Sequence, residues 1–372
     1  MPLPFALNSH LKSLAVYQPG RPIQEVAREH GLNPEDVIKL ASNENPLGPS
    51  PKALAAMRQV LDKSHLYPDG SAFYLKTKLA DKLGIGTDQL ILGNGSNEII
   101  EFIGHALLSE GDEVIVSQYG FAVYPLITAL FGATLVEVPA VEFGHDLPAM
   151  LRAVTPKTRV MFVANPNNPT GTMAPREQVV NLLNEIPPHV LLVMDEAYIE
   201  FLRDSVDLLP LVRSSLKKNL LLLRTFSKVY GLAGHRLGYG IGNHELIAAF
   251  EKIRQPFNIN AIAQAGAMAA LDDEEHLERT LGNNSQGLAF FENEFFQMKL
   301  SYVPSHANFI LVRVGSGNQV FNALQKIGVI TRPMGGYNLP DFIRISIGTP
   351  QENARCIQAL RAVMSELPNQ PA

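Results

Sequence analysis

The sequence has few of the residues that would support a secreted, disulfide-bonded or metal-binding protein. Among its 372 residues there is one cysteine, Cys356. A single cysteine excludes an internal disulfide and a thiolate metal cluster, and it fits a reducing compartment. The ten histidines show no His-Glu-x-x-His or similar ligand spacing. We therefore expect no metal site.

Long hydrophobic runs and an excess of positive charge are also missing. No apolar run approaches the length of a bilayer, and the first residues lack a basic segment followed by a long apolar stretch. The net charge is −5, and Lys and Arg are spread along the chain. We expect a cytoplasmic protein that binds neither membrane nor nucleic acid. Its length is enough for one large and one small domain.

Short apolar segments alternate with helix-length segments through the middle of the chain. Continuous apolar strands of this kind are typical of a mostly parallel sheet covered on both faces. The fold class predicted is α/β, with a large domain whose seven-stranded sheet lies between helices, plus a smaller α+β domain. The predicted domains are an N-terminal arm (1–40, part of the small domain), a large domain (41–258) and a small domain (259–372). The predicted strands are 89–92, 113–116, 134–138, 159–163, 190–194, 220–223 and 237–241.

Lys228 lies just past the apolar run 220–223, with Thr225, Ser227 and Arg236 close in sequence. An amine in this position can form a Schiff base, and hydroxyls and a guanidinium can hold a phosphate. This combination suits pyridoxal phosphate. A lysine after a strand is more often a surface residue, so the interpretation depends on other segments.

The glycine-rich run Gly93–Glu98 follows a predicted strand and opens a predicted helix, where backbone N–H groups can approach a phosphate. It departs from a dinucleotide fingerprint, because Glu98 stands where the third glycine belongs and no ribose-binding acid ends the next strand. A small phosphate cofactor therefore fits better than NAD. A tight turn without a ligand explains this run equally well.

Two further strand ends carry polar side chains. Asp195 ends strand 190–194, where its carboxylate can pair with the protonated pyridine nitrogen of the cofactor, although such an acid is often only a helix N-cap. Asn168 lies in the turn 165–171, and it and Tyr198 are candidates to bind the phenolic oxygen. Lysine, aspartate and asparagine at successive strand ends are the three functions that this cofactor needs.

Seven segments resemble, in order and spacing, the fold-type I pyridoxal phosphate aminotransferases and, within them, the histidinol-phosphate aminotransferases. The resemblance covers nearly the whole chain. The segments are 42–48, 67–70, 93–98, 165–171, 195–198, 227–236 and 344–349.

The resemblance implies a role for each matching residue. Lys228 would form the Schiff base and act as general base, Asp195 would pair with the pyridine nitrogen, and Asn168 and Tyr198 would bind the phenolic oxygen. Phe121 would stack on the ring. Tyr67 would reach the phosphate of a neighbouring subunit, which implies a homodimer with a shared active site. The phosphate would be held by Ser96, Asn97, Thr225, Ser227 and Arg236, and the substrate by Tyr17, Arg332 and Arg344.

The implied reaction belongs to histidine biosynthesis. It interconverts histidinol phosphate and 2-oxoglutarate with imidazole acetol phosphate and glutamate. An aromatic amino acid aminotransferase is the nearest alternative, because an apolar pocket separates similar flat rings only modestly. The related threonine-phosphate decarboxylases and a pyridoxal-phosphate-binding regulator without turnover are further alternatives.

Overall fold

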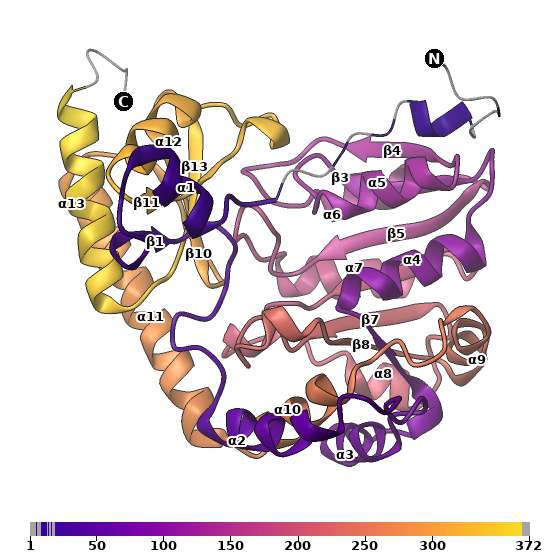
Figure 1. Ribbon diagram of the computed structural model, residues 1–372. Coiled ribbons are helices and arrows are strands. Elements are labelled where there is room, and N and C mark those ends of the chain that lie inside the picture. Colours follow the sequence, from indigo (N-terminus) through magenta and orange to yellow (C-terminus); the bar gives the residue numbers. More distant parts are fainter. Residues whose placement is uncertain (1–4, 6–8, 13, 15, 17–18, 367–372) are drawn as a thin grey trace.

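The computed structural model describes residues 5, 9–12, 14, 16 and 19–366. Figure 1 shows a large unit built on a central sheet and a smaller unit that lies beside it. The chain passes from the smaller to the larger unit after β1 (Ile38–Lys39) and returns along the long helix α11 (Glu274–Gln297).

The central sheet has seven strands in the order β2-β8-β7-β6-β5-β3-β4. Five of them, β7, β6, β5, β3 and β4, form parallel pairs, and β8 runs antiparallel to both of its neighbours, β7 and β2. This confirms the predicted mostly parallel seven-stranded sheet. The bounds are β2 Leu90–Gly93, β3 Glu113–Ser117, β4 Thr134–Val138, β5 Thr158–Ala164, β6 Leu191–Asp195, β7 Leu220–Thr225 and β8 Gly238–Gly242.

Both faces of this sheet are buried, which explains why its inner strands are continuously apolar. Leu220 and Leu222 point into one core, while Leu221 and Leu223 point into the other. Each buried leucine contributes about 1.5–3 kcal/mol of hydrophobic free energy. The second core is covered by α4 (Ser96–Leu107), α5 (Val123–Leu130) and α9 (His244–Ile253). The first is covered by α2 (Pro51–Val60), α3 (Phe73–Leu83), α6 (Leu147–Arg152), α7 (Arg176–Glu185), α8 (Leu209–Arg213) and α10 (Ala261–Ala270).

The smaller unit is an antiparallel sheet of order β12-β13-β10-β9 covered by helices. Its core contains Phe291, Ile310, Ile345 and Leu360. The N-terminal helix α1 (Ile23–His30) packs here against α12, and β1 pairs in parallel with β11. The bounds are β9 Tyr302–Val303, β10 Phe309–Arg313, β11 Val329–Ile330, β12 Arg332–Pro333, β13 Phe342–Ser346, α12 Gly317–Lys326 and α13 Pro350–Glu366.

The packing of α10 and α11 bears on the division between the units. Helix α10 packs against α2 and shares the core of the large unit. Helix α11 begins at Glu274, where the Asp273 side chain accepts a hydrogen bond from His276 N. The boundary after residue 258 stays a prediction, and the shared core argues for placing it after α10.

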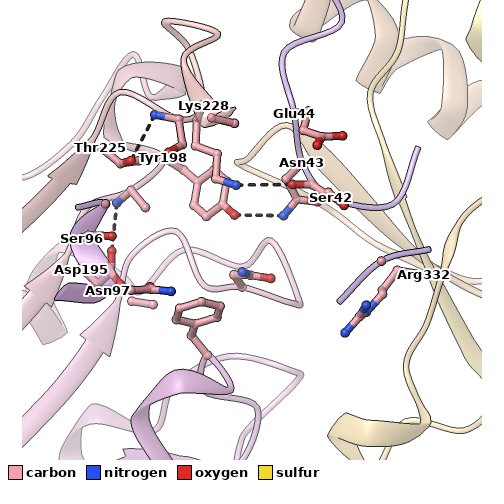
Figure 2. Close-up of a pocket in the computed structure, with 18 of the residues that line it drawn as sticks. Ser42, Asn43, Glu44, Ser96, Asn97, Asp195, Tyr198, Thr225, Lys228 and Arg332 are labelled. Carbon is pink, nitrogen blue, oxygen red and sulfur yellow. Dashed lines mark hydrogen bonds between the residues drawn. The ribbon is translucent and has the colours of Figure 1, made fainter. Parts of the chain in front are cut away.

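The proline-rich loop between β1 and α2 ends in a well-defined helix start. Ser50 Oγ accepts a hydrogen bond from Ala53 N at 3.0 Å, and Pro51 takes the first helical position. Serine at the N-cap and proline at the next position are both favourable because neither leaves a donor unsatisfied. The loop itself lies beside the carboxyl ends of the central strands (Figure 2).

Among the residues that the structure describes, no helix combines the length and apolar character needed to cross a membrane. The same residues contain no group of three His, Cys, Asp or Glu side chains that could hold a metal ion.

Candidate active site

A cavity of about 370 Å³ opens at the carboxyl ends of β5, β6 and β7, where the two units meet (Figure 2). Residues from the loop after β1 and from the smaller unit complete its wall. Twelve of the predicted site residues line it: Ser96, Asn97, Phe121, Asn168, Asp195, Tyr198, Thr225, Ser227, Lys228, Arg236, Arg332 and Arg344.

Lys228 projects into this cavity from the segment after β7. Its Nζ donates a long hydrogen bond of 3.5 Å to Ser42 O and lies 5.6 Å from the centre of the Tyr198 ring. Burial, with Arg344 nearby, lowers the pKa of the Lys228 amine to about 8. A larger fraction of the amine is therefore neutral near pH 7 than in an ordinary lysine, as a nucleophilic amine requires.

Asp195 ends β6 and is 5% exposed. Its Oδ2 accepts a hydrogen bond of 2.7 Å from Tyr124 Oη, and its Oδ1 accepts one of 3.2 Å from Ala197 N. Burial raises the pKa of Asp195, while the Tyr124 hydrogen bond, the Ala197 N–H and the Lys228 charge act in the opposite direction. A buried carboxylate in this position favours a cationic partner.

Tyr124 comes from the first turn of α5 and is fully buried. Its ring stacks on Phe162 of β5, with ring centres 4.4 Å apart and planes 6° apart. The stack fixes the ring, so the hydroxyl has one direction in which to donate. The sequence analysis missed this residue. The available signal was its place three residues after Phe121, whose ring centre lies 5.7 Å from that of Tyr124 at the start of α5.

Tyr198 also lines the cavity, and its hydroxyl accepts a hydrogen bond of 2.9 Å from Asn43 Nδ2. Figure 2 shows Ser42 and Asn43 facing Lys228 and Tyr198 from the loop after β1. The sequence analysis did not include either loop residue among the candidates. Their motif, 42–48, carried the resemblance, but no local pattern indicated what it would contact.

Asn168 and Arg344 meet across the boundary between the units. Arg344 Nη1 donates to Asn168 Oδ1 at 2.5 Å, and Nη2 donates to Ala41 O at 3.0 Å. Arg332 and Arg344 are cross-strand partners of β12 and β13, so two guanidinium groups reach the same cavity. They give this end of the cavity a positive charge.

The opposite end is built on the start of α4. Gly95 has a φ of +74°, and a side chain there would collide with the Arg236 guanidinium. A side chain at Gly238 would collide with the backbone of Ser96. Gly95 therefore makes room for Arg236, and Gly238 allows β8 to lie close to the start of α4. Arg236, the α4 N-terminus and the hydroxyls of Thr225 and Ser227 thus surround one end of the cavity. This is a donor set suited to a phosphate.

Glu98 explains why the glycine-rich run differs from a dinucleotide fingerprint. Its Oε2 accepts hydrogen bonds from Asn94 N at 2.7 Å and from Asn258 Nδ2 at 2.6 Å. The carboxylate holds the turn before α4 in place.

One predicted residue, Tyr67, is not in this cavity. Tyr67 is 82% exposed and stacks on Phe257 with ring centres 4.7 Å apart. Tyr17 lies outside the described residues. The wall also contains Glu44 and Tyr337, which the sequence analysis did not select.

The fold and the cavity define an enzyme class in which a lysine and an aspartate act at adjacent strand ends. The chain belongs to the aminotransferase class I and II family, whose model matches residues 35–360. It is 50% identical to the histidinol-phosphate aminotransferase of Akkermansia muciniphila over 358 residues, 96% of this chain and 98% of the relative. It is 49% identical to histidinol-phosphate aminotransferase 2 of Ralstonia nicotianae over 363 residues, 96% of each chain.

A solved structure gives the same result for the fold. The histidinol-phosphate aminotransferase from Sinorhizobium meliloti, in complex with pyridoxal-5'-phosphate, superimposes with a TM-score of 0.87 at 30% identity. The match covers 96% of this chain and 97% of the other. The predicted resemblance and fold class are confirmed.

Proposed function

We propose that this protein uses pyridoxal 5'-phosphate to transfer the amino group of histidinol phosphate to 2-oxoglutarate, giving imidazole acetol phosphate and glutamate. The observation that carries the proposal is the convergence of Lys228, Asp195 and Arg344 on one cavity. The full-length similarity to histidinol-phosphate aminotransferases supports the choice of substrate.

The residues of the cavity fit the cofactor. A phosphate fits among Arg236, the α4 N-terminus and the Thr225 and Ser227 hydroxyls, and a pyridine nitrogen fits beside the Asp195 carboxylate. Phe121 lies where it can cover one face of a ring. When bound, pyridoxal 5'-phosphate supplies an aldehyde that takes up the amino group and a ring that accepts negative charge from the substrate Cα.

Lys228 has two tasks in this proposal. Its amine first holds the cofactor through a covalent bond, and after the substrate displaces it, the free amine moves a proton between the substrate Cα and the cofactor's C4′ carbon. A pKa of about 8 suits both, because the amine is then close to half neutral at a slightly alkaline pH. Asp195 stays ionised beside the ring nitrogen, which keeps that nitrogen protonated.

Asn168 and Tyr198 bind the phenolic oxygen of the cofactor in this proposal. Arg332 and Arg344 bind the anionic groups of the substrates, because planar guanidinium groups match a phosphate or a carboxylate with paired hydrogen bonds. The same pair serves histidinol phosphate in one half of the reaction and glutamate in the other. Tyr17 stays a predicted contact to the substrate.

The proposal includes a cytoplasmic homodimer. Large apolar side chains are exposed together along η3 (Leu61–Lys63), the following loop and the start of α3. A second copy of the chain is the partner expected to cover them, since exposed apolar clusters mark contact surfaces. Tyr67 would then contact the cofactor phosphate of the partner. The exposed residues are Leu61, Leu66, Tyr67, Phe73 and Tyr74.

The substrate is tested by the half-reaction of the pyridoxal-phosphate-loaded protein. Histidinol phosphate, tyrosine and phenylalanine are supplied at equal concentration, and conversion to the pyridoxamine form is followed by absorbance. We expect rapid conversion with histidinol phosphate and much slower conversion with the aromatic amino acids. The reverse ranking would make the protein an aromatic amino acid aminotransferase. The variant Lys228→Ala should show no conversion with any of the three substrates.

The shared site is tested by mixing two variants. Lys228→Ala and Tyr67→Ala are each expected to be impaired, but a mixed dimer contains one site with an intact lysine and an intact partner tyrosine. Activity should therefore recover on mixing and subunit exchange. If mixed dimers form and activity does not recover, Tyr67 does not act in the partner's site.

A further inference from the structure

Asn43 occupies a position between the two units that neither the resemblance nor the proposed function explains. It is 1% exposed, and its φ of +54° places its backbone in the left-handed region. Asparagine tolerates this conformation better than most residues because its short polar side chain forms local hydrogen bonds. The residue lies in the loop after β1, beside the Tyr198 hydroxyl (Figure 2).

Three hydrogen bonds attach Asn43 to the smaller unit. Its backbone N donates to Ser346 Oγ at 2.8 Å, and Ser346 Oγ donates to Asn43 Oδ1 at 3.2 Å. Asn308 Nδ2 donates to Asn43 O at 3.0 Å. A fourth bond, from Asn43 Nδ2 to Tyr198 Oη at 2.9 Å, reaches the large unit.

The hydrogen bonds of Ser346 and Tyr198 together determine which way the Asn43 amide points. With Oδ1 toward Ser346, the serine proton has an acceptor and the Asn43 backbone N–H has the serine oxygen. If the amide were reversed, Ser346 Oγ would face two donors from Asn43 and its own proton would lose this acceptor. The reversed amide could still give both donors to the serine oxygen and accept the Tyr198 proton, so the two arrangements make equal numbers of hydrogen bonds among these three residues. Once a group in the cavity accepts the Tyr198 proton, the first arrangement makes one more hydrogen bond in a buried place and is favoured.

This orientation fixes the direction of the Tyr198 hydroxyl. An amide NH₂ group only donates, so Tyr198 Oη must accept from Asn43 and cannot give its proton to it. The proton of Tyr198 is left to donate to another group on the cavity side. In the proposed function that group is the phenolic oxygen of the cofactor.

We propose that Asn43 is a positioning residue that sets the hydrogen-bond polarity of Tyr198, so that the tyrosine donates to the cofactor's phenolic oxygen. The inference rests on the proposed function, because it needs pyridoxal 5'-phosphate bound through Lys228. A donor on the phenolic oxygen stabilises its negative charge and so weakens proton binding by the conjugated nitrogen that joins Lys228 to the cofactor. Through Ser346 and Asn308, the position of the smaller unit sets this polarity.

The decisive variant is Asn43→Asp, which keeps the shape of the side chain and reverses its polarity. Aspartate also tolerates the left-handed backbone. An ionised Asp side chain only accepts, so it draws the Tyr198 proton away from the cofactor. The readout is the pH titration of the bound cofactor's visible absorbance, measured on the loaded protein without substrate. We expect the apparent pKa of this absorbance to rise by about one unit.

The added negative charge also raises that pKa, and the Tyr198→Phe background separates the two effects. In this background Asn43→Asp acts through charge alone, so its shift should be clearly smaller than in the presence of Tyr198. Equal shifts in both backgrounds, or no shift in either, would overturn the inference. A purely structural role for Asn43 would lower stability without a Tyr198-dependent change in the absorbance titration.

Asn43→Gly is the second variant, for the case in which the aspartate variant does not fold. Glycine keeps the left-handed backbone and frees the Tyr198 hydroxyl to rotate. The apparent pKa of the cofactor's absorbance should rise when Tyr198 is present and stay unchanged when phenylalanine replaces it. If the pKa does not rise in the presence of Tyr198, the inference is overturned. If the wild-type protein gave no Lys228-dependent absorbance with pyridoxal 5'-phosphate, the proposed function itself would fail, before any variant is measured.

Discussion

Replacing Tyr124 by phenylalanine removes one hydroxyl group from the back of the candidate site and leaves the rest of the side chain in place. The ring retains its stack on Phe162, so no cavity forms and the start of α5 is undisturbed. What is lost is the 2.7 Å hydrogen bond to Asp195 Oδ2. Because both groups are buried, solvent does not readily replace the donor.

A hydrogen bond to a charged group contributes about 1.5–3 kcal/mol. Without it the Asp195 carboxylate is harder to keep ionised, and its interaction with a protonated pyridine nitrogen weakens. If this free energy is lost from cofactor binding, the affinity falls roughly 10- to 100-fold, at about 1.4 kcal/mol for each factor of ten. The measurement is titration of the cofactor-free protein with pyridoxal 5'-phosphate, followed by absorbance.

Tyr239→Phe is the matched control. Tyr239 is also buried and interacts with a charged group, Arg224, but it does not contact Asp195. The control should lose stability in denaturant without a comparable loss of cofactor affinity. The reasoning is refuted if Tyr124→Phe binds pyridoxal 5'-phosphate as tightly as the wild type, or if both variants lose affinity equally.

Three further predictions concern the site and the buried carboxyl group of Glu200. Gly95→Ala should force the Arg236 guanidinium aside and weaken cofactor binding by about tenfold or more, since a hydrogen bond between charged groups contributes about 1.5–3 kcal/mol; unchanged affinity in the same titration would mean that Arg236 does not hold the phosphate. The rate at which Lys228 captures pyridoxal 5'-phosphate should rise with pH and level off above a midpoint of about 8; a midpoint near that of ordinary lysine would contradict the lowered pKa. Burial raises the pKa of Glu200 from its ordinary value of 4.5 to about 7. The free energy of unfolding therefore falls as the pH rises from the unfolded pKa to the folded pKa, and the loss is complete above about 7. Glu200→Gln should therefore be more stable than the wild type at pH 8, by about 1–3 kcal/mol, and nearly equal to it at pH 5, as judged from denaturant midpoints.

Much of the fold followed from local patterns. Most strands of the central sheet could be located because strands buried on both faces are apolar throughout, whereas the edge strand β4 is largely exposed and mixes apolar with polar residues. The α10 helix was harder, because its alanine-rich pattern is compatible with either unit and only its packing on α2 shows which core it joins. The long helix α11 begins at Glu274, where the Asp273 side chain caps it.

The sequence by itself determined which chemical groups stand at the ends of the strands. Lys228, Asp195 and Asn168 each follow an apolar run, and parallel strands bring their carboxyl ends to one edge of the sheet, so their meeting could be predicted. Only the tertiary structure decided which groups support them. Tyr124 reaches Asp195 across 71 residues, Asn43 reaches Tyr198 across 155, and Arg344 reaches Asn168 across 176. Periodicity reports whether a side chain faces inward, but the partner it finds there depends on how distant elements pack together.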